Sequence, residues 1–301
     1  MGNRFRIVHF TDMHLSRIEE IRFDQLFSKR LIGFLNLRFR RSKEHDNMLA
    51  RKAAECALGL NPDHVLITGD LVNLALPVEY KEVVEWLKIF GLSPREITVL
   101  PGNHDAYIKK VWPDGPFSNN LNSYYRSDSG WKSDGEFPVV RDRGDVRIIG
   151  CSTAVPSPPF VAWGKLGSRQ IDRIKKALDE AEDRFCVIAL HHPPQKDITR
   201  WDNGLRDAEC LREIIRASGV KNCILLHGHM HRPVSGLVRG SAGGNRVLVW
   251  GTGSASLNKK DSLSAAQFRI LDFESGGLAN NVLYVYKSSI DNFIPQDHQE
   301  N

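Results

Sequence analysis

The chain has 301 residues, of which 41% are hydrophobic and 26% charged, and its formal net charge is +5. This composition is typical of a globular protein that buries a substantial core without disulfides, and the mild positive charge favours an anionic ligand. No run of eighteen apolar residues is present, and the first residues lack the apolar block of a secretory signal, so we expect neither a transmembrane helix nor a signal peptide. Five cysteines without CxxC spacing predict free thiols in a reducing cytoplasm.

Short apolar runs alternate with amphipathic segments along the first three quarters of the chain. The strand-like runs are Phe5–Phe10, His64–Thr68, Glu96–Leu100, Val146–Cys151, Phe185–Leu190 and Cys223–Leu226. Helical periodicity is found in Asn47–Leu60, Glu79–Phe90, Ser168–Glu182 and Ala208–Ser218, with Ser168 as an expected N-cap. The remainder predicts antiparallel hairpins from Val234–Val238, Arg246–Trp250, Gln267–Phe273 and Val282–Tyr286.

These elements predict an α/β layered chain organised as one domain over residues 1–290, with a β-rich part at 234–287 and a tail at 291–301. Residues 23–45 form a candidate lid or surface insertion. Within them, Phe27, Leu31, Phe34 and Leu35 make an apolar helical stripe in a basic segment. This stripe is read either as a core-packing helix with a solvated basic face or as an element at 23–41 that contacts a membrane surface peripherally.

Polar residues that can bind metals follow five of the strand-like runs. They are Asp12 and His14, then Asp70, then Asn103 and His104, then His191, and finally His229 and His231. In open α/β sheets, ligands bind outside the carboxyl ends of the strands, so these distant residues are expected to converge. Asp12 with His14, and His229 with His231, are expected to lie two apart on one side of an extended segment. Gly69, Gly102 and Gly228 precede ligand positions and permit close backbone approach.

The ordered set D-x-H, G-D, G-N-H-D, H before proline and G-H-x-H resembles the signature of the calcineurin-like metallophosphoesterases over residues 12–231. The resemblance is broader than one motif because all five blocks are present in order. It implies a four-layer α/β/β/α sandwich with mixed sheets. More loosely, the chain is similar to bacterial cyclic-nucleotide phosphodiesterases of this family.

The resemblance also implies a set of roles for these residues. Asp12, His14 and His231 would hold one divalent ion, Asn103, His191 and His229 would hold a second, and Asp70 would bridge them. The ions would be manganese, iron or zinc. His104 would not bind metal but would contact the phosphate or protonate the leaving alkoxide.

The chemistry of phosphate esters explains why such residues are needed. Two ions clamp the attacking and leaving oxygens of an in-line displacement and activate water as hydroxide near neutral pH. A carboxylate such as Asp70 can bridge because it has two oxygens, and an imidazole such as His104 titrates close to operating pH. Taken singly, each residue could be a helix cap, a turn residue or a core histidine, but five coincidences at strand ends favour metal binding.

Several neighbouring residues are expected to have other tasks. His192 is expected to point away from the metals, His227, His9 and His64 to be structural, and Asp105 to orient His104 or cap the following turn. The loops Tyr107–Asp134 and Gln195–Asp207 are expected to wall the substrate site.

The sequence therefore predicts a phosphodiesterase that acts on a cyclic nucleotide or a related small anionic phosphate ester, without a stable nucleic-acid complex. The alternative is a hydrolase of a UDP-2,3-diacylglucosamine-type pyrophosphate at the membrane surface, motivated by the amphipathic segment 23–41. A non-catalytic scaffold of the same fold would be expected to lose ligand residues, and a duplex-DNA nuclease would need further domains.

Overall fold

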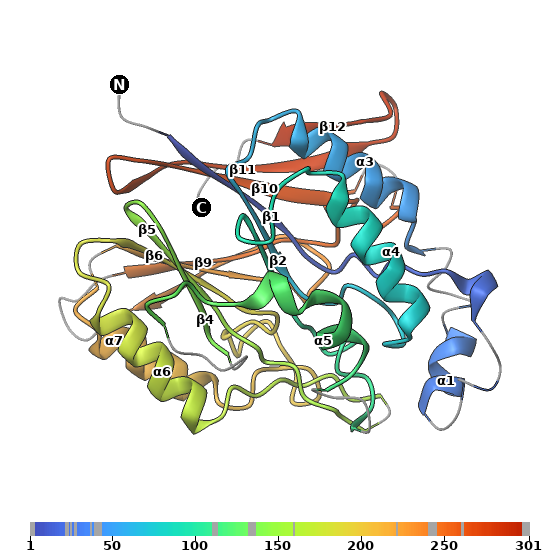
Figure 1. Cartoon of the computed structure of the whole chain (residues 1–301), viewed down its shortest axis with the longest axis horizontal. Coiled ribbons are helices and arrows are strands. Elements are labelled where there is room, and N and C mark those ends of the chain that lie inside the picture. Colours follow the sequence, from blue (N-terminus) through green and yellow to red (C-terminus); the bar gives the residue numbers. More distant parts are fainter. Residues whose placement is uncertain are drawn as a thin grey trace.

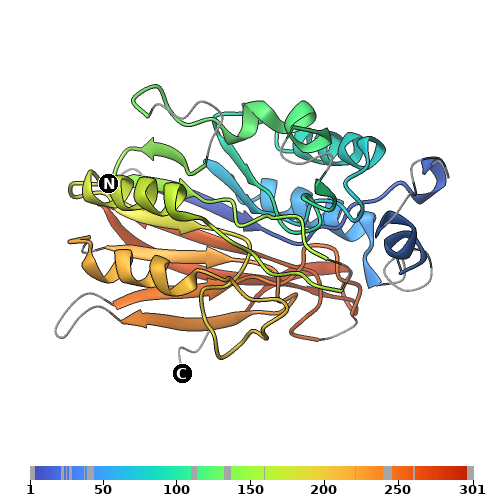
Figure 2. The same ribbon diagram turned by 90° about the horizontal axis from the view of Figure 1, so that it is seen from below.

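The computed structural model of the protein describes residues 4–21, 24, 26, 29–36, 38, 44–109, 114–131, 137–158, 160–220, 222–239, 246–259 and 262–296. Two six-stranded sheets stack at its centre, and helices cover their outer faces (Figures 1 and 2). The predicted four-layer α/β/β/α sandwich with mixed sheets is confirmed. Within the described ranges, no helix combines the length and apolarity needed to cross a bilayer.

The first sheet has the strand order β12-β11-β10-β1-β2-β3. Its strands are β1 (Phe5–Phe10), β2 (His64–Thr68), β3 (Ile97–Leu100), β10 (Gln267–Glu274), β11 (Gly277–Lys287) and β12 (Asn292–Gln296). β1, β2 and β3 pair in parallel, whereas β10 joins β1 in antiparallel register and continues through β11 to β12. The carboxyl ends of β1, β2 and β3 therefore share one edge of the sheet.

The second sheet has the order β4-β5-β6-β7-β9-β8. It contains β4 (Val139–Arg143), β5 (Val146–Gly150), β6 (Phe185–Ala189), β7 (Cys223–His227), β8 (Val234–Arg239) and β9 (Arg246–Gly251). The four central strands are parallel, and antiparallel β4 and β8 close the two edges.

The outer layers are built from helices whose apolar faces pack on the sheets. These helices are α3 (Asn47–Leu58), α4 (Pro77–Lys88), α5 (Pro116–Leu121), α6 (Ser168–Asp179) and α7 (Ala208–Ala217). The described residues also form helix α1 (Lys29–Asn36) and the 3-10 turns η1 (Ile18–Glu20) and η5 (Asn122–Tyr125). Apolar residues of α3, α4 and α5 share one core with the first sheet, and those of α6 and α7 share another with the second.

A third apolar cluster lies between the two sheets. In β1, Ile7 belongs to this inner cluster, whereas Val8 belongs to the outer core under the helices, as the two-residue period of a strand requires. Phe10 continues the outer side and meets Trp86 of α4 edge to face at 5.1 Å between ring centroids. Burial on both faces makes β1 a rigid support for the residues that follow it.

Two sequence predictions about elements were wrong in detail. Ser168 is the first residue of α6 rather than its cap, because Gly167 takes the N-cap position and its N–H is bound by the Asp207 carboxylate. Residues 292–296 of the expected tail form β12, which pairs with β11. The antiparallel hairpins predicted for the C-terminal part are confirmed as β8 with β9 and β10 with β11, and they belong to different sheets.

The predicted apolar stripe of segment 23–41 is only partly buried. In α1, Phe34 joins the core at 7% exposure, but Leu31 and Leu35 are each 48% exposed. The helix lies at one edge of the molecule, away from both sheets (Figures 1 and 2). Phe23, Phe27, Arg40 and Arg41 of this segment lie outside the described residues.

Candidate metal centre

The predicted site residues converge where strands of both sheets end. Asp12 and His14 follow β1, Asp70 follows β2, Asn103 and His104 follow β3, His191 follows β6, and His229 and His231 follow β7. Within the first sheet, the backbone N–H of His14 donates to the carbonyl of Asp70 at 3.0 Å. Between the sheets, the N–H of His229 donates to Asp12 Oδ2 at 2.8 Å. The site therefore connects the two halves of the sandwich.

Four side chains gather on one side of this site. Asp12, His14, Asp70 and His231 each offer a ligand atom within 4.8 Å of the others. Nε2 of His14 lies 3.1 Å from Nε2 of His231, which in turn lies 3.2 Å from Asp12 Oδ1. We refer to this group as the first metal position.

A second group lies beside it. Nε2 of His191 is 3.2 Å from Asn103 Oδ1 and 3.2 Å from His229 Nδ1. Nδ1 of His191 donates to the carbonyl of Thr68 at 2.7 Å, so that Nε2 of the neutral ring carries the lone pair that faces this group. Asn103, His191 and His229 form the second metal position.

The Asp70 carboxylate lies between the two positions. Its Oδ2 is 3.8 Å from His14 Nε2 of the first position and 3.4 Å from His191 Nε2 of the second. Its Oδ1 instead accepts the backbone N–H of His104 at 2.8 Å. A single oxygen of Asp70, rather than the two expected from the sequence, therefore faces both positions.

The electrostatics of the buried groups favour a positive charge between them. Burial alone would raise the pKa of Asp12, but the neighbouring His231 lowers it to about 2, and His191 and His104 hold the pKa of Asp70 well below its usual range. Burial would lower the pKa of His191, but the Asp70 carboxylate raises it to about 9. Without metal, a proton is thus held where a cation would bind.

The atoms that meet at the centre fit divalent ions. Asp12 Oδ1 is buried and accepts no hydrogen bond from the described residues, although such an atom is costly to leave without a partner. Carboxylate and amide oxygens mixed with imidazole nitrogens suit hard and borderline divalent ions. All five cysteines are free thiols, and the three metal-ligand groups among the described residues contain no cysteine.

The expectation that the D-x-H and H-x-H pairs lie on extended backbone was wrong. Asp12 and His14 have φ of 52° and 47°, and His229 and His231 have φ of 71° and 49°. Asp70 shares this left-handed conformation with φ of 52°. Non-glycine residues seldom adopt it, and each costs about 1–3 kcal/mol unless the surroundings enforce it. The left-handed turns aim alternate side chains into the centre.

None of the three predicted glycines has room for a side chain, and two of them pack on carboxylates. A Cβ on Gly102 would lie 2.3 Å from Asp70 Oδ1, and one on Gly228 would lie 2.6 Å from Asp12 Oδ2. Both distances are shorter than any ordinary carbon–oxygen contact. These glycines therefore allow the backbone to pack directly on the two carboxylates, as the sequence predicted.

His104 stands beside the centre and is held from two sides. Its Nδ1 lies 2.8 Å from the carbonyl of Asn73, to which it donates, and its ring stacks on Tyr107 with centroids 5.8 Å apart. The Asn73 loop is itself fixed by the buried Glu79 carboxylate, which accepts the N–H groups of Asn73 and Leu74. The ring of His104 is thus placed by the backbone and by packing.

The prediction that His192 points away from the metals was wrong: its ring lies 4.6 Å from that of His229, and one of its nitrogens belongs to a group of potential ligand atoms with His191 and His229. His192 adjoins His191 and His229, but its Nδ1 is bonded to Thr153 Oγ1 at 2.7 Å and its Nε2 to the carbonyl of Ala162 at 3.0 Å. Both ring nitrogens are therefore engaged outside the metal positions. His9, His64 and His227 are fully buried. His9 forms hydrogen bonds with Thr68 and Thr252, His64 with Thr98, and His227 with the carbonyl of Gly228.

Asp105 supports the turn that carries it, rather than the turn that follows. Its carboxylate accepts the N–H of Gly102 at 2.8 Å and that of Leu71 at 3.3 Å, which ties the turn after β3 to the end of β2. Burial, together with the charge of Asp70, raises its pKa to about 8.

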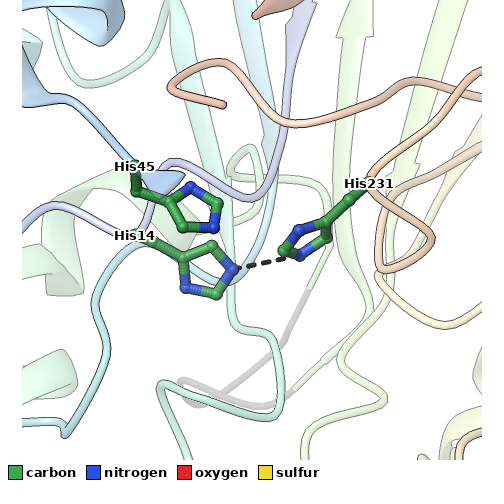
Figure 3. A group of neighbouring side chains, drawn as sticks. All are labelled: His14, His45 and His231. Carbon is green, nitrogen blue, oxygen red and sulfur yellow. Dashed lines mark hydrogen bonds between the residues drawn. The ribbon is translucent and has the colours of Figure 1, made fainter. Parts of the chain in front are cut away.

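Sequence reasoning missed His45. Its ring lies 4.5 Å from that of His14 and 5.3 Å from that of His231, between centroids. Figure 3 shows all three imidazoles gathered at the first metal position. His45 does not directly follow a strand-like run and belongs to no ligand motif. The search for ligands at strand ends therefore did not find it.

Comparison with known proteins gives a consistent picture. The sequence profile of the family described as Calcineurin-like phosphoesterase matches residues 5–233. A probable cyclic nucleotide phosphodiesterase of Rhodococcus erythropolis is 27% identical over 58% of this chain and 53% of its own length. The 3′,5′-cyclic adenosine monophosphate phosphodiesterase of Haemophilus influenzae is 26% identical over 58% of this chain and 56% of its own length. A probable glycerophosphodiester phosphodiesterase of Arcobacter nitrofigilis is 25% identical over 47% of each chain.

The chain thus matches about half the length of these curated relatives. Among solved structures, a dimetal phosphatase from Danio rerio superimposes with a TM-score of 0.60 at 14% identity and covers 93% of this chain and 95% of its own. A purple acid phosphatase from yellow lupin gives a TM-score of 0.58 at 12% identity, and the match covers 98% of this chain and 53% of the phosphatase. At such low identity these structures establish the fold alone.

Proposed function

Because the chain belongs to the calcineurin-like phosphoesterase family, we propose that it is a hydrolase that uses two divalent ions to cleave a phosphodiester. The leading substrate class is a cyclic nucleotide or a related small organic phosphate, the class named for several relatives. The observation that carries the proposal is the position of Asp70 Oδ2, which faces His14 on one side and His191 on the other.

We assign the ligands as the geometry groups them. The first ion would be held by Asp12, His14 and His231, and the second by Asn103, His191 and His229. Asp70 would bind both ions. The ions, when bound, would neutralise the phosphate charge and lower the pKa of a water molecule that attacks phosphorus. Asn103 contributes an uncharged oxygen, which leaves the centre with excess positive charge for an anionic substrate.

His104 is the proposed proton donor to the leaving alkoxide. Its Nδ1–H is bound to the carbonyl of Asn73, so Nε2 is the atom that would meet the substrate. An imidazole suits this task because its ordinary pKa of about 6.5 allows both protonation states near neutral pH. The Asn73 carbonyl and the Tyr107 ring fix its orientation.

A hydrolysis screen tests this function. The purified chain would be stripped of metal, reloaded separately with Mn²⁺, Fe²⁺ or Zn²⁺, and assayed with bis(4-nitrophenyl) phosphate, cyclic nucleotides, glycerophosphodiesters and phosphomonoesters. We expect metal-dependent turnover of the diesters that exceeds turnover of the monoesters. An absence of turnover with every ion would refute the proposal. A cytoplasmic location remains a prediction from the cysteine pattern.

A second candidate substrate class is favoured by the surface of α1. Leu31, Ile32 and Leu35 are each about half exposed on this short helix. Its opposite side is held to the loop after β2, because Arg30 donates to the carbonyls of Leu74 and Ala75. An exposed apolar helix in a basic segment suits a membrane surface and hence an amphiphilic phosphate ester, such as a UDP-2,3-diacylglucosamine-type pyrophosphate.

The same helix adjoins the proposed acid. A Cβ on Gly33 would lie 2.2 Å from the hydroxyl oxygen of Tyr107, whose ring stacks on His104. A lipid surface docked on α1 would therefore lie beside the centre. Flotation with phosphatidylglycerol–phosphatidylcholine vesicles tests this idea with the triple variant Leu31→Ser, Ile32→Ser and Leu35→Ser. Leu263→Ser, which alters an exposed leucine elsewhere, is the control. Equal flotation of all forms would leave only the soluble substrate class.

A further inference from the structure

His45 is held firmly between α1 and α3, next to the first metal position. The N–H of Asp46 donates to the carbonyl of Ser256 at 2.9 Å, and the N–H of Asn258 donates to the carbonyl of Glu44 at 2.7 Å. His45 thereby pairs with Leu257 as an isolated antiparallel bridge. Backbone bonds on both sides therefore fix the backbone of this residue, and the contact of Nδ1 with Ser256 Oγ holds its ring.

The imidazole of His45 is directed at two of the proposed ligands. One ligand atom from each of His14, His45 and His231 lies within 4.8 Å of the others. In Figure 3 the ring nitrogen of His45 that is farther from its backbone points toward the other two rings. The Asp12 and Asp70 carboxylates do not belong to this group of three, so His45 meets the first position through His14 and His231, which belong to both groups.

A hydrogen-bonded chain favours a proton on Nδ1 of His45. Nδ1 lies 2.8 Å from Ser256 Oγ, which lies 3.3 Å from Ser254 Oγ, which donates to the carbonyl of Asp12 at 2.6 Å. If Nδ1–H donates into this chain, each contact in it has one donor and one acceptor, and Ser254 Oγ uses its second lone pair to accept the backbone N–H of Ser256. The lone pair is then on Nε2, the nitrogen that faces the first position.

We propose that His45 Nε2 is a further metal ligand, so that the first position has three imidazoles, from His14, His45 and His231. Metal-bound histidines commonly donate their other N–H to a fixed acceptor, and Ser256 Oγ provides that acceptor here. Ligand atoms on opposite sides of an ion, with bonds of about 2.1 Å, lie about 4.2 Å apart. Atoms now within 4.8 Å of one another would therefore need to move by only a fraction of an ångström when the ion binds. The inference rests on the metal centre of the proposed function.

This assignment predicts which ion the first position prefers. Imidazole suits zinc and iron, whereas carboxylate, carbonyl and water oxygens suit magnesium and manganese. A third imidazole therefore shifts the first position toward zinc. Removing it should weaken zinc binding more than manganese binding.

The test measures bound metal directly. Metal-free wild type, His45→Ala and His45→Gln would be dialysed against buffered free Zn²⁺ or Mn²⁺, and bound ions counted by mass spectrometry. We expect one of the two zinc ions of each variant to require at least about tenfold more free zinc for half-occupancy, with a smaller change for manganese. His298→Ala, which removes a histidine outside the described residues, is the control, and circular dichroism checks that each variant is folded.

A zinc-loaded crystal structure provides the second readout. The proposal requires His45 Nε2 at about 2.0–2.1 Å from an ion. Unchanged zinc occupancy in His45→Ala, or an ion with no bond to His45, would overturn the proposal even if turnover were lost, since His45 would then serve the substrate. If His45-dependent zinc binding were found with no hydrolysis of any phosphate ester, this inference would stand and the proposed function would fail.

Discussion

The Asp70 carboxylate accepts the backbone N–H of His104 at 2.8 Å. The residue proposed to bridge the two ions thus also fixes the backbone of the residue proposed to protonate the leaving group. Metal binding and proton donation are therefore mechanically connected through one carboxylate. With both roles as proposed, this arrangement would hold the acid close to the ions, as an in-line displacement needs.

Asp70→Asn should impair both metal positions at once. The substitution replaces the anionic Oδ2, which faces His14 and His191, by a neutral group while keeping the size of the side chain. We expect the affinity for both ions to fall by more than about 100-fold, because second-shell substitutions alone cost 10–100-fold. Counting bound metal by mass spectrometry checks this expectation. Retention of two tightly bound ions would contradict the bridging role.

His104→Ala should separate metal binding from proton transfer. We expect two bound ions, as in the wild type, and a kcat lower by about 10²–10⁴ for substrates with an alkoxide leaving group. The defect should be smaller with bis(4-nitrophenyl) phosphate, because 4-nitrophenolate leaves without protonation. If the variant lost metal, or if the defect were equal for both leaving groups, His104 would not be the acid.

Gly102→Ala tests the close packing at Asp70. The added Cβ would meet Asp70 Oδ1 at 2.3 Å and Asp70 N at 2.4 Å, so the turn or the carboxylate must shift. We expect weaker binding of both ions and a free energy of unfolding lower by about 1–3 kcal/mol, as for other overpacked sites. The matched control is Gly130→Ala, since nothing lies within 4 Å of a Cβ at Gly130. Equal behaviour of the two variants would show that the contact at Gly102 is unimportant.

The layered fold and the convergence of the site could be predicted because both depend on local sequence patterns. Ile7 and Val8 alternate between two cores, and the residues that follow each parallel strand share an edge. The left-handed φ of Asp12 and His231 could not be predicted, because it is imposed by contacts between loops distant in sequence. His45 was missed for a similar reason, since Ser256 places it from 211 residues away.

The binding of metal should release a proton below about pH 9. In the metal-free protein, the Asp70 carboxylate raises the pKa of His191 to about 9, so this ring is protonated at pH 7.5 and must lose its proton to bind an ion. Metal affinity should accordingly rise with pH, by up to about tenfold per unit, and level off above pH 9. Titration calorimetry in buffers of different ionisation enthalpy measures the released protons. Affinity that is constant between pH 6 and 8 would contradict this sign.

The position of two ions relative to Asp70 is the central claim, and anomalous diffraction from crystals soaked in Mn²⁺ tests it most directly. We predict two anomalous peaks about 3.5–4 Å apart, both within bonding distance of Asp70 Oδ2, one near His14 and the other near His191. A single peak, or two peaks that do not share Asp70, would contradict the two-metal account.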